Sequence, residues 1–327
     1  MLVAITGATG HLGLPTVRRL LEADHRVRVL KRRTSNITSI KQYDVEFNTI
    51  SFEDPGSLRQ ALRGVDVLLH LASEISVMPL MKDQLLHTNL TGTQNLLSAA
   101  LAEKVKRLVY VSSIHAIPSS GVETQLDERI ELDEGKVYGD YGYTKALATK
   151  FILRATLTSA IETLAFCPSG IVGPFDKGTS HMGKVIRDYI RKRLPFYLDG
   201  GYNFVDVRDV ADVLVKSVLK GRAGQHYLLG GDKVNIKDLF HHLGEITGVR
   251  YPQFPIPFSV ANALAYPNAY LHRAFRLSTL FTPDSIRTLR ENGNICSKLA
   301  ADTFNFHPIS WKKSIEDQVA WYRSAKP

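Results

Sequence analysis

Short, almost uninterrupted apolar runs alternate with helix-like patterns through the first half of the chain, and this alternation limits the fold more than any other feature. The runs expected to form strands are residues 2–6, 26–31, 44–50, 65–72, 107–113 and 161–167. Helices are expected at residues 14–24, 54–64 and 83–105 and from about residue 141. Asp54 and Pro55 suit the cap and first turn of the second helix. Strands that are apolar on both faces lie between two helical layers, so the order predicts an α/β fold with a doubly wound parallel sheet.

The second half of the 327-residue chain is less regular. It contains a basic helical run, a return segment at 203–221, a strand-like run at 225–231 and a helix at 235–248. There is no internal repeat and no low-complexity linker, so we expect one compact unit with two lobes. Residues 1–165, with a return segment near 204–230, should form the sheet domain, and residues 166–327 mainly a smaller second lobe.

Composition favours an ordinary globular protein of a reducing compartment, with 44% hydrophobic and 22% charged residues and only two cysteines. We see no signal peptide, no metal-ligand spacing and no uninterrupted membrane span, and we expect a cytoplasmic protein without membrane insertion. The net charge of +9 raises the question of nucleic acid. The basic runs at 26–33 and 186–193 lack interleaved aromatics, so a phosphorylated small molecule explains the charge better than nucleic acid.

A glycine-rich loop, "ITGATGHLG", joins the first strand to the first helix. Gly7, Gly10 and Gly13 permit a tight turn, close approach of backbone to a pyrophosphate and close helix–strand packing. The position after an apolar strand indicates a Rossmann-type dinucleotide site, although a plain strand-to-helix turn would need similar glycines.

The end of the second expected strand indicates which dinucleotide is bound. Lys31, Arg32 and Arg33 stand where NAD enzymes place an acid for the ribose hydroxyls. A guanidinium can bind a 2′-phosphate through two hydrogen bonds. We therefore predict NADP(H), with Arg32 as the main contact and NAD(H) less favoured; a solvated basic strand end is the alternative.

Tyr141 and Lys145 are four residues apart in an expected helix, so their side chains project from one face. A phenol titrates near ~10, and a neighbouring ammonium stabilises its phenolate. Such a pair can exchange a proton, but the spacing also recurs by chance in ordinary helices.

Several motifs in order give the chain a specific resemblance: "TGATGHLG", "HLAS", "NLTGTQNLL", "VYVSS" and "YGYTK". With "PSGIVGP", "NFVDVRDVAD" and "YLLGG", the sequence resembles the extended short-chain dehydrogenase/reductase family over nearly its whole length. It is most similar to the branch of dihydroflavonol reductases, bacterial aldehyde and ketone reductases and 3β-hydroxysteroid dehydrogenases.

The resemblance implies roles for individual residues. Tyr141 matches the proton-transferring tyrosine, Lys145 its partner, and Ser113 the serine that hydrogen-bonds the substrate, with Ser112 as the fallback. The residues expected to bind the cofactor are Gly7, Thr9, Gly10, His11, Leu12, Gly13, Arg32, Leu71, Ala72, Ser73, Asn89, Tyr141, Lys145, Pro168 and Ile171.

These features favour an NADP(H)-dependent oxidoreductase that transfers hydride to or from the carbonyl or hydroxyl group of a hydrophobic small molecule. The apolar stretch 254–275 should help form the substrate lobe, and His115 should contact the substrate or pack beneath it. Two alternatives stay open: a nucleotide-sugar epimerase or dehydratase, and a non-catalytic NADPH-binding sensor. Tyr202, Asn203 and Gly170 depart from the residues common in sugar-modifying relatives, whereas the basic run at 186–193 could meet a diphosphate. Family members often pair into dimers, so a homodimer is a further expectation.

Overall fold

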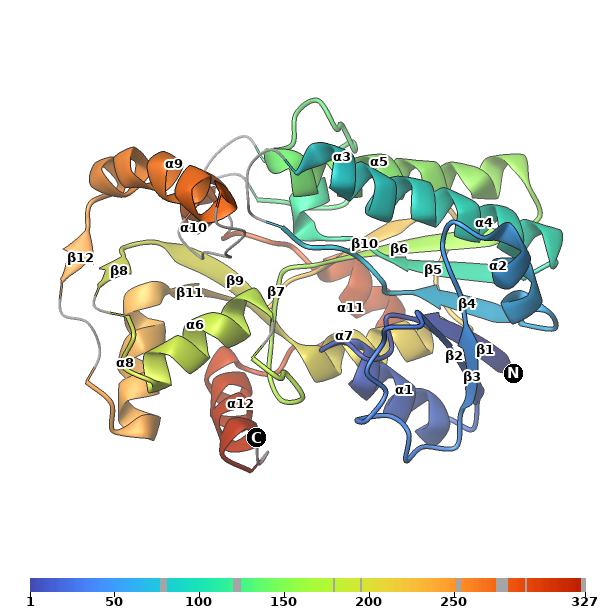
Figure 1. Ribbon diagram of the computed structural model, residues 1–327, viewed down its shortest axis with the longest axis horizontal. Helices are drawn as coiled ribbons and strands as arrows, with labels where there is room; N and C mark the ends of the chain where they lie inside the picture. The colour runs from blue at the N-terminus through green and yellow to red at the C-terminus, as the bar shows by residue number, and fades with distance from the viewer. Residues whose placement is uncertain are drawn as a thin grey trace.

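The computed structural model describes residues 1–76, 81–119, 125–178, 180–194, 196–250, 254–274, 282–291 and 293–324. Its largest sheet is parallel and seven-stranded, in the order β10-β6-β5-β4-β1-β2-β3 (Figure 1). The strands are β1 (Leu2–Thr6), β2 (Arg26–Lys31), β3 (Glu46–Thr49), β4 (Val67–His70), β5 (Arg107–Val111), β6 (Glu162–Pro168) and β10 (His226–Leu229). The predicted fold class, a doubly wound parallel sheet of Rossmann type, is confirmed.

Helices cover both faces of this sheet, which explains why its strands are apolar on both sides. One layer contains α1 (Gly13–Glu22), α7 (Val207–Lys216) and α11 (Lys298–Phe304), and its core includes Val17, Val210 and Phe304. The opposite layer contains α2 (Pro55–Leu62), α4 (Gly92–Ala102) and α5 (Gly139–Thr158), with Leu58, Leu96 and Ile152 in its core.

One feature of the helices agrees with its prediction from the sequence, and another differs. Asp54 caps α2 as predicted, because its side chain accepts a hydrogen bond from the Gly56 amide at 2.9 Å. The single helix expected at 83–105 is instead three consecutive pieces: α3 (Lys82–Leu85), a π-helical segment (Leu86–Thr91) and α4. Asn89 lies in the π-helical segment and is buried.

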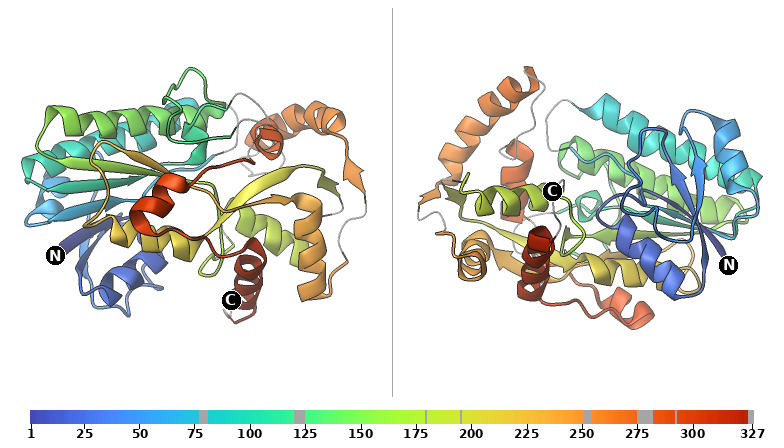
Figure 2. Two further views of the ribbon diagram at one scale, coloured as in Figure 1. Left: turned by 180° about the vertical axis from the view of Figure 1, so that it is seen from behind. Right: turned by 60° about the horizontal axis from the view of Figure 1, so that its bottom comes forward.

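The second lobe is built mainly from the later chain and lies beside the carboxyl ends of the large sheet (Figures 1 and 2). Its strands are β7 (Gly170–Val172), β9 (Gly201–Asp206) and β11 (Asp232–Asn235) in one sheet and β8 (Tyr197–Leu198) and β12 (Pro255–Ile256) in another. Its helices are α6 (His181–Ile190), α8 (Ile236–Thr247), α9 (Phe258–Ala274), α10 (Pro283–Glu291) and α12 (Trp311–Ser324). The return segment divides between the lobes, since β9 joins the small sheet and α7 packs against α1.

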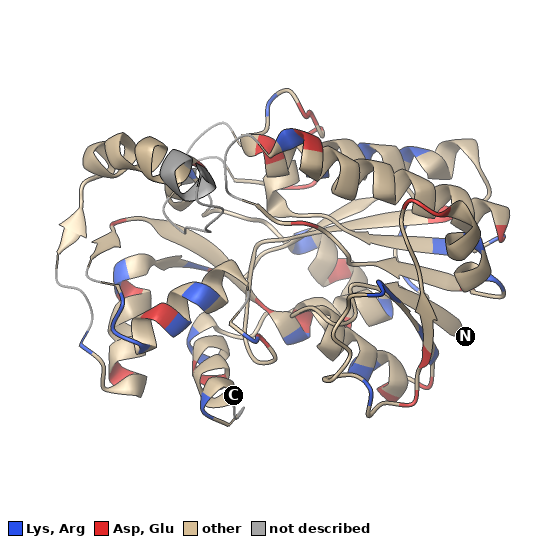
Figure 3. Cartoon of the chain, in the orientation of Figure 1, with Lys and Arg blue, Asp and Glu red and all other residues tan. Residues whose placement is uncertain are grey.

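Charged residues are scattered over both lobes in Figure 3, and most of α9 is free of them. None of the helices in the described ranges has the length and hydropathy needed to cross a bilayer. The predicted boundary between the domains at 165/166 stays a prediction.

Candidate active site

The glycine loop lies at the carboxyl end of β1 and is fixed by close backbone packing. Gly7 has φ +73°, and a Cβ there would come within 2.8 Å of the Ala72 amide nitrogen. A Cβ at Gly13 would lie 2.2 Å from the Gly7 carbonyl oxygen. The loop therefore packs against residues Leu71 and Ala72 at the end of β4, the segment predicted to lie under the cofactor.

The amino end of α1 suits an anionic group. The first turn of α1 contains no acidic residue, so a pyrophosphate would meet only the partial positive charge of the helix. Gly10 is exposed, while Thr9 and Leu12 are partly buried at this end. The His11 Nε2 lies 3.0 Å from the Pro174 carbonyl oxygen. Burial lowers the pKa of the His11 imidazole. Its side chain thus links α1 to the segment after β7.

The end of β2 presents the predicted basic residues. Arg32 and Arg33 are exposed, and Lys31 donates a hydrogen bond to Thr49 Oγ1 at 3.2 Å. Within the described residues, no ion pair engages the Arg32 or Arg33 guanidinium. By contrast, Arg28 is held by Glu46 at 2.7 Å. Arg32 is available to a phosphate in a way that Arg28 is not.

Ser113 and Tyr141 meet where β5 ends and α5 begins. Burial raises the pKa of the Tyr141 hydroxyl to about 12, while hydrogen bonds with Ser113 and Ser73 act in the opposite direction. Ser112 is engaged elsewhere, since its Oγ lies 2.6 Å from Thr149 Oγ1. Of the two serines, Ser113 therefore acts on the pKa of Tyr141, whereas the Ser112 hydroxyl bonds to Thr149.

The other two tyrosines of this segment lie in different surroundings. Tyr138 stacks with Arg287, whose guanidinium carbon is 4.0 Å from the ring centroid. Tyr143 lies against Lys82, whose Nζ is 3.9 Å from its ring centroid. Of the three, Tyr141 is the one whose hydroxyl bonds with the serine at the end of β5.

Lys145 is fully buried one turn further along α5. Its Nζ donates to the Tyr110 hydroxyl at 2.6 Å and to the Val111 carbonyl oxygen at 2.8 Å. Burial lowers the pKa of this ammonium to about 7, because the charged form loses solvation. Tyr110 was not among the predicted site residues, and only the packing of α5 on β5 reveals its contact with Lys145.

Asn89 bonds to the loop after β4 and to α5. Its Oδ1 accepts from Ser73 Oγ at 3.1 Å and from the Glu74 amide at 2.8 Å, and its Nδ2 donates to the Glu74 carbonyl oxygen at 2.9 Å. A longer bond of 3.4 Å reaches Thr144 Oγ1 on α5. Asn89 thus fixes the Ser73 loop relative to the helix that carries Tyr141.

The segment after β6 offers one polar group that sequence reasoning missed. Pro168 is buried at the end of β6, and Ile171 is partly buried in β7. Ser169 lies between them, and its buried Oγ has no hydrogen-bond partner in the described parts of the chain. An orphaned hydroxyl in the segment expected to meet the nicotinamide is consistent with a ligand there.

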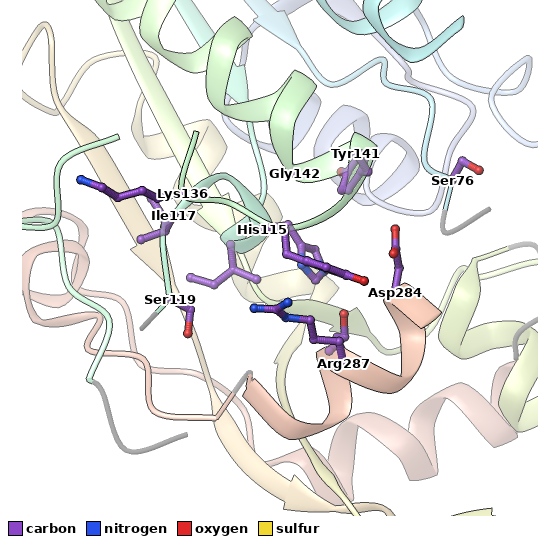
Figure 4. A pocket seen from close by; sticks show the side chains of 12 residues that line it. Ser76, His115, Ile117, Ser119, Lys136, Tyr141, Gly142, Asp284 and Arg287 are labelled. Carbon is purple, nitrogen blue, oxygen red and sulfur yellow. The ribbon is translucent and has the colours of Figure 1, made fainter. Parts of the chain in front are cut away.

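Tyr141 lines a pocket to which α10 of the second lobe contributes Asp284 and Arg287 (Figure 4). The lining residues are Ser76, Ile114, His115, Ile117, Ser119, Lys136, Tyr138, Tyr141, Gly142, Asp284, Arg287 and Thr288. Asp284 and Arg287 were not predicted, since no motif marks α10. Within the expected apolar stretch, residues 254–269 have described side chains and none of these lines the pocket, whereas the side chains of 270–275 lie outside the described part.

His115 connects this pocket to the small sheet. Its Nε2 lies 3.2 Å from the Tyr202 hydroxyl, and its ring meets the Tyr141 ring edge to face at 6.0 Å between centroids. Burial lowers the pKa of His115 to about 4, so the ring is neutral at pH 7. Gly170 makes room for Tyr202, because a Cβ at 170 would lie 2.3 Å from the Tyr202 ring.

Over the ranges that the structure describes, no group of three or more His, Cys, Asp or Glu side chains could hold an ion.

Similarity to known proteins extends over the whole chain. Sterol demethylase protein B of Methylococcus capsulatus is 31% identical over 327 residues, covering 99% of this chain and 98% of that protein. A putative dihydroflavonol 4-reductase of Synechocystis is 27% identical over 324 residues, covering 98% and 94%. The crystal structure of gox2253 superposes with a TM-score of 0.86 at 30% identity, covering 98% of each chain.

A more distant structure shows the shared fold alone. UDP-glucose 4-epimerase of Thermus thermophilus, solved in complex with NAD, has a TM-score of 0.81 at 19% identity and full coverage of both chains. The family model of the NAD dependent epimerase/dehydratase family matches residues 3–230. The resemblance predicted from the motifs is therefore confirmed: this chain belongs to the NAD dependent epimerase/dehydratase family, the extended short-chain dehydrogenases/reductases, and is an enzyme of that family.

Proposed function

We propose that this protein is a cytoplasmic NADP(H)-dependent oxidoreductase that acts on the carbonyl or hydroxyl group of a hydrophobic small molecule. The observation that carries the proposal is the Tyr141 hydroxyl, bonded with Ser113 beside a pocket and one helical turn from the buried Lys145. A non-catalytic sensor would have no need of this set.

The proposed cofactor site lies at the carboxyl end of the large sheet. The glycine loop and the acid-free amino end of α1 would hold the pyrophosphate, and Ser169 and Ile171 would meet the nicotinamide. When bound, the nicotinamide supplies or accepts the hydride.

The protein's own part in the reaction is proton transfer and orientation. At neutral pH Tyr141 is protonated, and its hydroxyl would donate a proton to the carbonyl oxygen as negative charge develops there. Ser113 would donate a hydrogen bond to the same oxygen and stabilise that charge. A phenol that stays protonated near pH 7 suits the reducing direction.

Preference for NADP(H) over NAD(H) is proposed from the end of β2. Arg32 is exposed and without an acidic partner among the described residues, so it can meet a 2′-phosphate without first breaking an ion pair. No acid follows β2 to repel that phosphate.

The substrate class is proposed from the pocket and from relatives. Ile114, Ile117 and Tyr138 give the pocket an apolar and aromatic side, and α10 adds polar groups at its rim. Relatives similar to this chain include sterol demethylase protein B and cinnamoyl-CoA reductase 1 of Petunia hybrida. The hydrophobic class is therefore proposed from the apolar side of the pocket and from these relatives, and Lys136, Asp284 and Arg287 would contact polar substituents of the substrate.

The family also contains epimerases, and one experiment separates the two activities. NADPH absorbance is followed with a panel of aldehydes, ketones and steroids, and UDP- and GDP-sugars are assayed in parallel for epimerised product. We expect stoichiometric NADPH oxidation with at least one apolar carbonyl compound. Conversion of a sugar nucleotide without net cofactor consumption would contradict the proposal. Assembly into a homodimer stays a prediction.

A further inference from the structure

Lys145 is fully buried. Its ammonium donates a hydrogen bond to Tyr110, which was not among the predicted site residues. Building on the proposed function, we propose that Tyr110 is a positioning residue whose hydroxyl holds the Lys145 ammonium in place for the reaction. Tyr110 lies on β5, three residues before Ser113, and is 1% exposed.

The argument begins with the hydrogen bonds of the ammonium. A lysine ammonium has three donors and no acceptor. Two of the three are used within the protein, on Tyr110 Oη at 2.6 Å and on the Val111 carbonyl oxygen at 2.8 Å. This leaves one donor for the ligand side of the site, so the two protein bonds together set where that donor lies.

The groups that face Lys145 from the packed elements give it no counter-charge. They are Tyr110 on β5, which bonds to it directly, and Cys167 on β6 and His70 on β4, while Tyr141 lies one turn earlier on α5 and is coupled to Tyr110. Burial raises the pKa of Tyr141 and of Cys167 to about 12 and lowers that of His70 to about 3, so all three are neutral at pH 7. Neutral oxygen acceptors must therefore stabilise the buried ammonium, and Tyr110 supplies the side-chain one.

Tyr110 is itself held in a rigid setting. Its ring packs against His70 with centroids 5.5 Å apart. The two nitrogens of His70 bond to Thr6 Oγ1 at 2.7 Å and to Thr93 Oγ1 at 3.0 Å. The hydroxyl that receives Lys145 is thus fixed by β1, β4 and α4 together.

The test measures the titration of Lys145 directly. Lysine side chains are labelled with ¹³C at Cε, and the Lys145 resonance is assigned by its absence in Lys145→Met. In Tyr110→Phe the ammonium loses an acceptor, so its charged form is less favourable and its midpoint should fall by about one pH unit. Tyr110→Met, which also lacks the hydroxyl, should shift the midpoint in the same direction.

The matched control is Tyr227→Phe. Tyr227 is also a buried strand tyrosine, and its hydroxyl accepts from the Arg222 amide at 2.9 Å, away from the site. This control should leave the Lys145 midpoint unchanged. An unchanged midpoint in both Tyr110 variants would overturn the inference.

Turnover gives a second readout that a purely structural role would not produce. The alkaline fall in kcat/KM should begin about one pH unit lower in Tyr110→Phe, giving about tenfold less activity at pH 8. A uniform loss at all pH values, with no shift, would contradict the inference. Wild-type protein that turns over no carbonyl compound would instead defeat the proposed function, and the titration would still decide the role of Tyr110.

Discussion

Tyr141 is one of three tyrosines in six residues, and its chemistry comes from its neighbours. Burial keeps its hydroxyl protonated, whereas Ser113 and Ser73 hydrogen-bond it at the mouth of a pocket. Tyr138 and Tyr143 instead lie against the cations Arg287 and Lys82. The three tyrosines thus have two kinds of surroundings: Tyr141 is buried beside serines, and the other two contact cations.

Replacing Tyr141 by Phe removes the proposed proton donor and leaves the ring in place. We expect kcat to fall by about 10²–10⁴-fold, because general acid catalysis contributes on that order. Steady-state kinetics with NADPH and a carbonyl substrate measure the loss. Tyr143→Phe is the control and should retain near-native turnover; equal activity in the two variants would contradict the assignment.

Arg32→Ala tests the choice of cofactor. Loss of a charge-assisted hydrogen bond to a 2′-phosphate should weaken NADPH binding by about 10- to 100-fold and leave NADH binding nearly unchanged. Fluorescence titration measures both dissociation constants. Arg28→Ala is the comparison, since Arg28 is already paired with Glu46. Tighter binding of NADH than of NADPH to the wild-type protein would refute the role of Arg32.

At the scale of elements, the site depends on how closely α1 approaches β1. Gly13 begins α1, and its missing side chain lets the Gly7 carbonyl and the Ala8 backbone lie against the helix. This approach brings the amino end of α1 to the carboxyl end of the sheet, where parallel sheets bind ligands.

Gly13→Ala should therefore disturb both stability and binding. The added Cβ would lie 2.2 Å from the Gly7 oxygen, and backbone must move to admit it. We expect a loss of about 1–3 kcal/mol or more in unfolding free energy, seen as a lower thermal midpoint, and weaker NADPH binding. Gly92→Ala is the control, because a Cβ there would meet only the Phe52 side chain, at an ordinary contact distance of 3.4 Å. Equal midpoints for the two variants would show that the packing is less tight than described.

The elements differ in how far sequence could predict them. The individual strands, the glycine turn and the α2 cap follow from local patterns, because each depends on residues within a few positions. The π-helical segment at Leu86–Thr91 does not, since no local signal distinguishes it from the α-helix around it. Asp284 and Arg287 reach the pocket through packing between lobes, more than 140 residues from Tyr141 in the chain. His11 was predicted at the cofactor from its place in the motif, yet its ring bonds to Pro174, which only the folded chain brings near.

At the scale of the whole molecule, α10 of the second lobe contacts the start of α5. Gly139, with φ +73°, admits the Asp284 carboxylate, since a Cβ there would lie 2.6 Å from its Oδ2. Arg287 stacks on Tyr138 from the same helix. Both lobes therefore line the pocket beside Tyr141, and α10 is part of the second lobe's contribution.

Arg287→Ala tests the contribution of α10 to substrate binding. We expect KM for the carbonyl substrate to rise by about tenfold, because a polar contact and one wall of the pocket are lost. The dissociation constant for NADPH should stay within about twofold of wild type. Loss of NADPH affinity in this variant would show that α10 supports the first lobe instead.

The pH dependence of stability also belongs to the whole molecule. Burial lowers the pKa of His70 to about 3 and those of His115 and His181 to about 4. The unfolded chain binds protons at these histidines below pH ~6.5, whereas the folded protein does not, so stability should fall as pH drops from 6.5 toward 4.

Two carboxyls act in the opposite direction. The pKa values of Asp209 and Asp284 are raised to about 6, chiefly by burial, so their contribution to stability increases as pH falls below 6. The destabilising effect of the three histidines exceeds the stabilising effect of the two carboxyls, so we expect the thermal midpoint to decrease as the pH falls below 6.5. His115→Phe should weaken that decrease, and a midpoint that rises steadily from pH 6.5 to 4.5 would contradict the account.

Transfer of isotope from the cofactor tests the central claim most directly. NADPH carrying deuterium at the transferable position of C4 is incubated with the best carbonyl substrate, and the product is analysed by mass spectrometry. We predict one deuterium on the carbinol carbon in wild-type protein and almost none with Tyr141→Phe over the same time. A product without deuterium, or a product formed at an undiminished rate by Tyr141→Phe, would contradict the account.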